Sequence, residues 1–315
     1  SVRETGRTYF ERNEANPLEE DLIIVDEASM LDISLFYHLL CALKDGARLI
    51  LVGDIDQLPP VGAGEPLKDL MSWGYVPIVR LKRIFRQEEG SGIVENAALI
   101  RKGEMCVPDE AGEFRIIYAA DDEDAYRIVM DLCRELNYGN EENKMLLQVL
   151  SPMYRGVCGV DHLNESLQEM IHGEKVPDGM KFFPGDKVMQ TRNDYEKGIY
   201  NGDVGTVWTA TPQKVFVRYF DKEVVYEGEE RFDLRLAYAV TVHKSQGSEY
   251  ETVIFILRPS QHNMLQRNLL YTGVTRARKN TILVTAPDAL RRALAIQHTG
   301  NRYSLFLPFL NHEAL

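Results

Sequence analysis

Two short apolar runs, LIIVDEA (residues 22–28) and ARLILVG (residues 47–53), decide the fold of this chain. Between them lies ISLFYHLLCAL (residues 33–43), whose apolar residues recur at helical spacing. Buried apolar strands that alternate with amphipathic helices are typical of a parallel sheet with helices on both faces. The sequence therefore predicts an α/β fold that begins at the first of these runs.

Later segments extend this pattern and then interrupt it. MLLQVLSP, LRLAYAV, TVIFIL and NTILVTAP each predict a buried strand, and two α/β sheets accommodate them better than one. Between residues 181 and 235, short alternating strands are separated by PGD, NGD and TP, which is typical of a small antiparallel barrel. Because α/β segments flank it, we expect this barrel to be inserted into the second α/β domain.

Length and composition exclude several classes of protein. A chain of 315 residues with 44% hydrophobic and 27% charged residues is long enough for two folded domains, which excludes disorder and collagen-like fibre. It contains no apolar run of the roughly 18 to 20 residues that a membrane helix needs, and no apolar leader, so we expect a cytoplasmic protein without a membrane partner. The four cysteines are far apart, without metal-ligand or disulfide spacing, and are expected to be buried thiols.

The net charge of -12 argues against a nucleic-acid partner when it is taken over the whole chain. The charge is unevenly distributed, however. Residues 104–142 contain twelve acids and three bases, whereas residues 231–279 contain eight bases and three acids. A solvated acidic helix and an ordinary surface of mixed charge would give the same counts. The charge distribution alone therefore does not decide whether the protein binds nucleic acid.

Polar residues follow the two deciding strands at the point where each is expected to end. Asp26 and Glu27 follow the first strand, and Gln57 lies in GDIDQLPP (residues 53–60) after the second. Open α/β sheets bind ligands at the carboxyl ends of their strands. In nucleotidases a first acid there holds Mg²⁺, a second acts on the attacking water, and a glutamine contacts the γ-phosphate or that water. The alternatives are two exposed acids at a strand end and a plain turn rich in proline and glycine.

Five segments in order resemble motifs II to VI of superfamily 1 helicases. They are DEAS (residues 26–29), GDIDQLPP, RLKRIFRQ (residues 80–87), AYAVTVHKSQGSEYETV (residues 237–253) and YTGVTRARK (residues 271–279). The sequences of these segments most resemble those of the RecD-like branch, the exodeoxyribonuclease V alpha subunit family. SPMYRGVCGVDHLN (residues 151–164) and FFPGDKVMQTRNDYEKGIYNGDVG (residues 182–205) also resemble that branch. There, a small SH3-like barrel interrupts the second motor domain.

The resemblance implies an α/β fold with two RecA-like motor domains, the first incomplete, and an SH3-like β-barrel inserted in the second. The remainder of the first motor domain would span residues 1–80. The second would span residues 81–180 and 236–315, and the barrel residues 181–235.

The resemblance also assigns the ATP and Mg²⁺ site. Asp26 would bind Mg²⁺, Glu27 would be the catalytic base, and Gln57 would sense the γ-phosphate. Arg86 of motif IV and Arg276 of motif VI would stabilise charge on the transferring phosphoryl group, as guanidinium groups do in phosphoryl transfer. Gly247 and Glu249 would bind the nucleotide, with Glu249 on the ribose. The neighbouring arginines of motifs IV and VI, Arg83 and Arg278, are expected to form surface ion pairs instead.

Single-stranded DNA is the partner that the resemblance implies. Thr241, His243 and Lys244 match the strand-contacting part of motif V, although the lysine is equally able to lie along the surface. In the barrel, cationic and aromatic groups able to follow and stack a strand are Arg192, Asn193, Tyr195 and Tyr200. Aromatic side chains in small barrels usually belong to the core, so that part of the interface has an equal alternative.

One expected motif is missing. The 315 residues contain no G-x-x-x-x-G-K-[ST] loop, the segment that holds the β- and γ-phosphates in such motors. Together with Ser1 at the start, this predicts the C-terminal piece of a longer helicase, inactive without its missing N-terminal region. Other subunits of a recombination exonuclease are possible partners of such a protein. The alternatives are the helicase part of a conjugative relaxase and a non-catalytic nucleic-acid-binding or subunit-interaction module.

Overall fold

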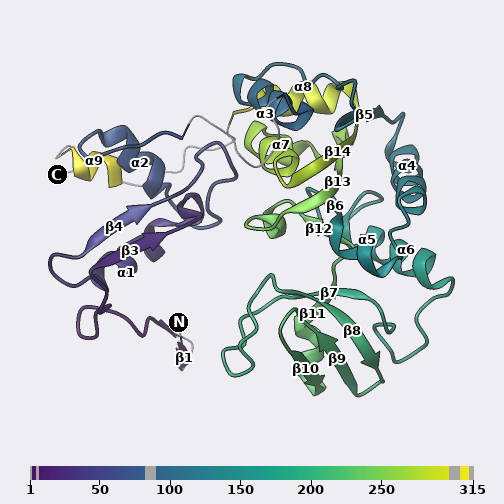
Figure 1. Ribbon diagram of the computed structural model, residues 1–315, viewed down its shortest axis with the longest axis horizontal. Coiled ribbons are helices and arrows are strands. Elements are labelled where there is room, and N and C mark those ends of the chain that lie inside the picture. The colour runs from purple at the N-terminus through teal and green to yellow at the C-terminus, as the bar shows by residue number, and fades with distance from the viewer. Residues whose placement is uncertain (1, 5–6, 82–89, 298–305, 312–315) are drawn as a thin grey trace. The chain divides into compact units, whose positions relative to one another are not determined.

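The computed structural model describes residues 2–4, 7–81, 90–297 and 306–311. The chain divides into two compact units, residues 1–83 with 298–315 and residues 84–297, and each is described here by itself (Figure 1). The sequence places residues 236–315 in the second motor domain. The structure instead groups the segment around α9 (Phe306–Leu310) with the first unit, where Phe306 meets Phe36 edge to face.

The first unit contains the strand, helix and strand that the opening apolar runs predict. Strands β3 (Leu22–Val25) and β4 (Arg48–Leu51) pair in parallel, with Leu22 opposite Arg48. Helix α1 (Ile33–Cys41) connects them, and the Asp32 carboxylate caps it by accepting from the Leu35 backbone N–H at 2.7 Å. The other elements of this unit are β1 (Val2–Glu4), β2 (Arg7–Tyr9), the 3-10 helix η1 (Ala28–Met30) and α2 (Pro66–Trp73).

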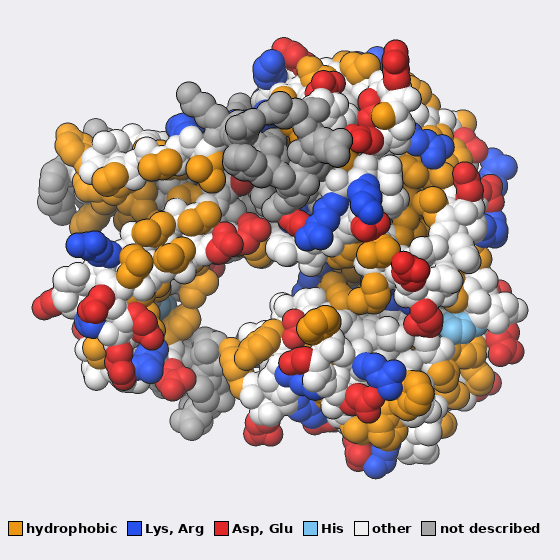
Figure 2. All heavy atoms as spheres, viewed as in Figure 1, with side chains coloured by type: hydrophobic (Ala, Val, Ile, Leu, Met, Phe, Trp, Pro, Cys, Tyr) orange, Lys and Arg blue, Asp and Glu red, His pale blue; other side chains and the backbone are white. Residues whose placement is uncertain are grey.

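The two strands of this unit are less buried than the sequence predicts. Ile24 is 60% exposed, and Leu22, Ile50 and Val52 are also exposed. Figure 2 shows hydrophobic side chains gathered over this part of the unit. The expectation of fully buried strands is therefore wrong for β3 and β4. In the part of the chain that the structure describes, β3 and β4 pair only with each other, so their sheet lacks the further strands that a wide parallel sheet has.

The second unit contains a five-stranded parallel sheet in the order β12-β6-β13-β14-β5. Figure 1 shows α4 and α6 along one side of it and α3 and α7 on the other. Its strands are β5 (Phe114–Tyr118), β6 (Leu147–Ser151), β12 (Ala239–Thr241), β13 (Tyr250–Leu257) and β14 (Ala277–Thr285). Its helices are α3 (Gly92–Lys102), α4 (Asp122–Glu135), α5 (Glu141–Leu146), α6 (Val160–His172), α7 (Arg267–Val274), α8 (Pro287–Ala295) and the 3-10 helices η3 (His243–Ser245) and η4 (Pro259–Met264).

The inserted barrel is an antiparallel sheet in the order β10-β9-β8-β7-β11. Its strands are β7 (Lys187–Gln190), β8 (Val204–Ala210), β9 (Lys214–Arg218), β10 (Glu223–Glu227) and β11 (Leu234–Leu236), with the 3-10 helix η2 (Gly228–Asp233). Alternate residues such as Val207, Val217 and Val224 fill its core. LRLAYAV, expected to be one strand, is divided between β11 of the barrel and β12 of the parallel sheet, so the chain leaves the barrel at Ala237 and Tyr238.

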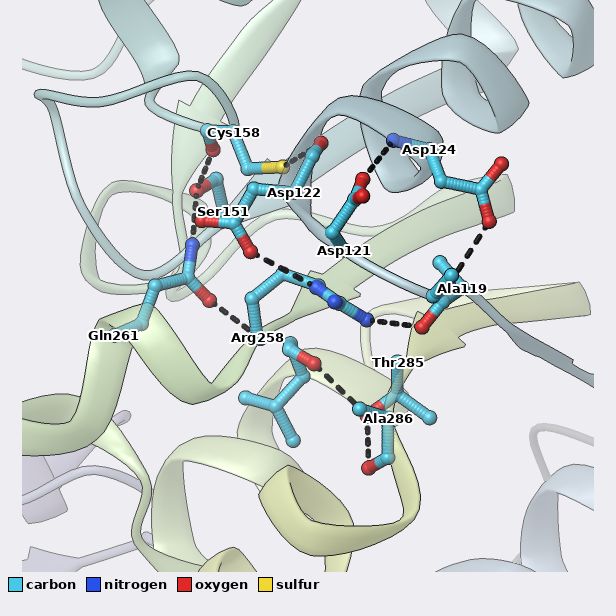
Figure 3. A network of polar contacts seen from close by, with 12 residues as sticks. Ala119, Asp121, Asp122, Asp124, Ser151, Cys158, Arg258, Gln261, Thr285 and Ala286 are labelled. Atoms are coloured by element: carbon cyan, nitrogen blue, oxygen red, sulfur yellow. Dashed lines mark hydrogen bonds and ion pairs between the residues drawn. The ribbon is translucent and has the colours of Figure 1, made fainter.

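A buried arginine joins the carboxyl ends of the parallel strands (Figure 3). Arg258, 2% exposed, follows β13 and donates through Nε to Asp122 at 3.1 Å and through Nη1 to the carbonyl of Ala119 at 2.9 Å. The Gln261 side chain accepts from the Arg258 backbone N–H and donates to the Ser151 hydroxyl. This network connects the ends of β5, β6 and β13, and thereby fixes the loops that leave this edge of the sheet.

We expect Arg258→Met to destabilise the protein strongly. The methionine leaves the buried Ala119 carbonyl without its donor and removes the partner of Asp122, whose side chain is 31% exposed; an acceptor left unsatisfied in this way typically costs about 1–3 kcal/mol. Arg291→Met is the matched control, because Arg291 pairs with Asp288 on the surface of α8 and such pairs contribute about 0–1 kcal/mol. Urea unfolding of both variants tests this expectation, and equal losses of stability would contradict it.

A buried polar junction connects the barrel to the parallel sheet. At the start of β7 the Asp186 carboxylate, fully buried, accepts from the side chains of His172 at 2.8 Å and Tyr238 at 2.8 Å. The next residue, Lys187, donates through Nζ to Gln148 at 2.9 Å and to the carbonyl of Leu147. Burial, and to a smaller extent the charge of Lys144, lowers the pKa of Lys187 from 10.5 to about 7. The barrel is thus fixed to β6 by fully buried bonds and to α6 by the partly buried bond of His172.

This junction should leave a signature in the pH dependence of stability. Between about pH 7 and 10.5 the unfolded chain keeps a proton on Lys187 that the folded protein has released. The unfolded state therefore binds more protons, and stability from this residue rises with pH, by up to about 1.4 kcal/mol per pH unit. The cost of burying the charge is fully present below about pH 7. We expect the wild-type free energy of unfolding to rise relative to that of Lys187→Met across this range, whereas parallel curves would contradict the assignment.

Two further expectations concern cysteines and membranes. All four cysteines are free thiols; three are buried, and burial raises the pKa of Cys106, Cys133 and Cys158 to about 12. Cys41 is only partly buried. Among the described residues, the helices are too short or too polar for any of them to span a bilayer.

Candidate functional site: two strand ends, motif V and a barrel loop

The first candidate site lies at the carboxyl ends of β3 and β4. Asp26 and Glu27 directly follow β3, and the Ala28 backbone N–H donates to the carbonyl of Val52 at 2.8 Å, which holds the acidic segment against the end of β4. A Cβ on Gly53 would lie 2.8 Å from the backbone nitrogen of Ser29, so only glycine permits this close approach. The two polar segments that the sequence singled out are therefore neighbours.

Glu27 has an unusual backbone conformation. Its φ of 50° places it in the left-handed region, which disfavours residues other than glycine by roughly 1–2 kcal/mol. The Glu27 N–H donates to the Asp26 carboxylate at 2.8 Å, and this bond helps to hold the turn. Strained conformations of this kind are concentrated at functional sites. Both carboxylates remain accessible, since Asp26 is exposed and Glu27 partly so.

Two oxygen atoms in the segments that follow β3 and β4 lack hydrogen-bond partners among the described residues. They are Oγ of Ser29 and Oε1 of Gln57, both buried at the atom level, and both residues line the same small pocket of the first unit. Buried polar atoms are normally satisfied, so two buried oxygens without a partner in the protein are available to a ligand or a water molecule. Carboxylate, hydroxyl and amide oxygens are the donor set that Mg²⁺ prefers. The side chains that follow β3 and β4 therefore include oxygen ligands of the kind that suits Mg²⁺.

Motif VI of the second unit supplies a buried cation. The Arg276 side chain, 2% exposed, donates through Nε to the carbonyl of Thr272 and through Nη1 to the carbonyl of Ser248, both at 3.2 Å. These two carbonyl acceptors help to hold its guanidinium in place. By contrast, Arg278 is exposed and its Nε donates to Glu249 at 2.7 Å, the surface ion pair that the sequence predicts for it.

Gly247 and Glu249, the residues expected to bind the nucleotide, lie on either side of Ser248. Gly247 has a φ of 76°. Glu249, expected to contact the ribose, therefore directly follows the residue whose carbonyl holds Arg276. Arg86 and Arg83 lie outside the described residues.

Motif V includes β12 and continues into η3. Thr241 is buried, and its hydroxyl accepts from the Lys244 backbone N–H at 3.3 Å, which stabilises the turn into η3. His243 begins η3 and is partly buried. The Lys244 ammonium donates to Oδ1 of Asn201 in the barrel at 2.6 Å. Motif V is therefore bonded to the barrel, a contact that the sequence did not predict.

The barrel candidates lie on one loop between β7 and β8. Tyr195 and Tyr200 are exposed, with ring centroids 6.1 Å apart in an edge-to-face arrangement, so they do not belong to the barrel core. The Asn193 side chain donates to the Tyr195 hydroxyl at 3.2 Å, and Arg192 lies 3.4 Å from Asp233. The structure thus brings the aromatic barrel residues and motif V into one region of the second unit.

Three family models match segments of this chain. The UvrD-like helicase C-terminal domain matches residues 236–284, and the AAA domain matches residues 4–116. The ATP-dependent RecD-like DNA helicase SH3 domain matches residues 163–219. The motor segments and the barrel are therefore each similar to parts of helicases.

Curated relatives extend this similarity over almost the whole chain. The ATP-dependent RecD2 DNA helicase of Deinococcus radiodurans is 37% identical over 304 residues, which cover 95% of this chain and 41% of the relative. The RecBCD enzyme subunit RecD of Mycolicibacterium smegmatis is 33% identical over 94% of this chain and 56% of the relative. The chain belongs to the RecD-like family of superfamily 1 helicases. It spans about half the length of these curated relatives.

Solved structures of Pif1 helicases are similar in fold to this chain. The crystal structure of Pif1 helicase from Bacteroides in complex with ADP-AlF3 and ssDNA has a TM-score of 0.58 and 20% identity, over 97% of this chain and 78% of that one. Pif1 helicase from Candida albicans has a TM-score of 0.53 and 19% identity, over 89% and 75% of the two chains. At these identities the likeness concerns the fold alone.

Two polar residues of this RecD-like chain were not assigned by sequence reasoning. Ser29 is the serine of the DEAS segment, and its position beside the acids was the available signal. Asn201 belongs to the NGD turn of the barrel, which indicates only a turn. Its role as acceptor for Lys244 depends on residues 43 positions apart in the chain, and no local pattern reveals such a contact.

Proposed function

We propose that this chain is part of an ATP-dependent DNA helicase motor that moves 5′ to 3′ on single-stranded DNA in repair or recombination. The observation that carries the proposal is that strained Glu27 and the unsatisfied oxygens of Ser29 and Gln57 all lie in the segments that follow two adjacent strand ends. A binding module without catalysis has no need for that arrangement. Membership in the RecD-like family supports the same reading.

In this proposal each residue has a distinct task. Asp26 holds Mg²⁺, Glu27 takes the proton of the attacking water, and the Gln57 side chain binds that water or the γ-phosphate. Arg276 and Arg86 stabilise the negative charge that spreads over the phosphoryl oxygens during transfer. A magnesium ion held by Asp26 would supply further positive charge to the phosphate oxygens.

The nucleotide contact of Glu249 is also part of the proposal. Its Oε2 accepts from Arg278, which holds the carboxylate in place beside the segment of motif V that contains Gly247. A carboxylate oriented in this way is suited to accept hydrogen bonds from ribose hydroxyls.

We further propose that these residues act together with a nucleotide-binding loop from another part of the motor. The 315 residues contain no such loop, and the apolar face of β3 and β4 is exposed although parallel sheets are normally covered. Additional strands and helices of a complete motor domain would cover that face. We therefore expect the 315-residue chain alone to hydrolyse no ATP at a useful rate.

Single-stranded DNA is the proposed track. We propose that Thr241, His243 and Lys244 of motif V contact the strand together with Arg192 and Asn193 of the barrel, and that the exposed Tyr195 and Tyr200 stack its bases. Subunits of a recombination exonuclease are proposed partners, because the Mycolicibacterium relative is named as a RecBCD subunit.

Strand displacement by the complete gene product tests the proposal. Two duplexes that differ only in having a 5′ or a 3′ single-stranded tail are offered with ATP. We expect the 5′-tailed duplex to be unwound and the 3′-tailed one to remain intact. Unwinding of the 3′-tailed duplex alone would contradict the direction, and failure to unwind either would favour a role in binding only.

A further inference from the structure

The barrel loop at residues 191–203, here named the aromatic loop, is exposed but internally ordered. The Asn201 N–H donates to the Asn193 side chain at 2.9 Å, and Asp194 and Ile199 exchange two backbone hydrogen bonds. From the barrel, the Lys222 ammonium donates to the carbonyl of Gly198 at 2.6 Å. These bonds give the loop a defined shape, on which the rings of Tyr195 and Tyr200 are presented to solvent.

A further bond connects the aromatic loop to motif V. The Lys244 ammonium donates to Oδ1 of Asn201 at 2.6 Å. Burial, and to a smaller extent the charge of Arg235, lowers the pKa of Lys244. A partly buried ammonium loses part of its hydration, and the amide oxygen of Asn201 is one partner that offsets this loss. The Lys244 ammonium, which the sequence indicates as a cation for DNA, is therefore hydrogen-bonded to the barrel.

We propose that Lys244 is a positioning residue, whose bond to Asn201 holds the aromatic loop against motif V so that its two tyrosines stack bases of a single strand. The strand's backbone then lies along Thr241 and His243, while its bases meet Tyr195 and Tyr200. Aromatic side chains stack on every base, which suits a motor that must follow any sequence. The inference deepens the proposed strand binding and rests on it.

This role differs measurably from that of a phosphate ligand. Removing a cation that contacts a single-strand phosphate lowers the slope of log affinity against log salt by about 0.7. Removing a positioning residue leaves that slope unchanged, because no phosphate contact is lost, and instead weakens the stacking of bases on the tyrosines. Stacking contributes about 1–3 kcal/mol per base, and a loss near the lower end of this range weakens binding about tenfold. Asn201 carries no charge and cannot bind a phosphate as a cation does. Its truncation to alanine should therefore weaken binding as much as loss of Lys244 only if the bond between the two residues positions the loop.

The experiment measures binding of fluorescein-labelled oligothymidylate to the 315-residue chain at several salt concentrations. The variants are Lys244→Met, Asn201→Ala and their combination. Lys214→Met is the matched control, because it removes a cation that pairs with Glu227 on the barrel. We expect each single variant to bind about tenfold more weakly, the double variant no more weakly than either, and all slopes to equal the wild-type slope. The control should bind within about twofold of wild type.

A lower salt slope in Lys244→Met together with full affinity in Asn201→Ala would overturn the proposal, because the lysine would then be a phosphate ligand. Hydrogen exchange of the aromatic loop gives an independent readout. We expect faster exchange at residues 191–203 in Lys244→Met and Asn201→Ala but not in Lys214→Met. Unchanged exchange would show that the link does not hold the loop, and would overturn the proposal whether or not the chain binds DNA. Faster exchange in a chain that binds no oligothymidylate would uphold the link and refute the strand-binding function.

Discussion

Replacing Arg276 with alanine in the complete gene product should reduce the turnover number for ATP hydrolysis by about 10³-fold or more. The guanidinium is held by the carbonyls of Thr272 and Ser248, so its position is fixed before the reaction begins. A positive charge fixed in advance at the transferring phosphoryl group stabilises the transition state without reorganisation. Steady-state hydrolysis at saturating ATP and single-stranded DNA measures the effect.

The matched control for this experiment is Arg278→Ala, two residues further along the same motif. Arg278 is exposed and paired with Glu249, so its loss removes a surface ion pair, and we expect at most a modest rise in KM for ATP. Because Arg276 is buried, thermal unfolding and DNA binding must be measured on the alanine variant and on Arg276→Lys. Equal losses of turnover for Arg276→Ala and Arg278→Ala would contradict the assignment of motif VI.

Replacing Glu27 with glutamine should reduce turnover by about 10²- to 10⁴-fold, the range that a general base contributes. Glutamine has nearly the same shape but cannot accept the proton of the attacking water. Since the backbone at Glu27 already has a positive φ, the substitution introduces no new strain. ATP and DNA binding should therefore persist while hydrolysis is lost, and single-turnover measurements separate these steps.

Glu20→Gln is a suitable control, because Glu20 is exposed and precedes β3 rather than following it. Turnover of this variant should match the wild type. If Glu27→Gln retained more than about a tenth of wild-type turnover, another residue would have to be the base.

Sequence reasoning predicted the parts of the fold whose signals are local. The strands that follow a buried apolar pattern, such as β6, β13 and β14, are present and buried. The barrel was visible from its alternating residues and turn sequences. The adjacency of the DEAS and GDIDQLPP segments followed from the rule that parallel strands end at one edge of a sheet.

What sequence reasoning missed depends on distant parts of the chain. Burial of β3 and β4 was overestimated, because an apolar strand is buried only where neighbouring strands and helices cover it. The division of LRLAYAV between two sheets has no local signal, since both halves are apolar. The bonds of Lys244 to Asn201 and of Lys187 to Gln148 join residues about 40 positions apart. Arg86 lies outside the described residues, and its role stays a prediction.

Stimulation of ATP hydrolysis by single-stranded DNA tests the central claim most directly. The complete gene product, its Glu27→Gln variant and the 315-residue chain are compared with and without oligothymidylate. We expect stimulated hydrolysis from the complete product alone. A complete product that binds single strands but hydrolyses no ATP would contradict the account, because its motor residues would then serve binding and not movement.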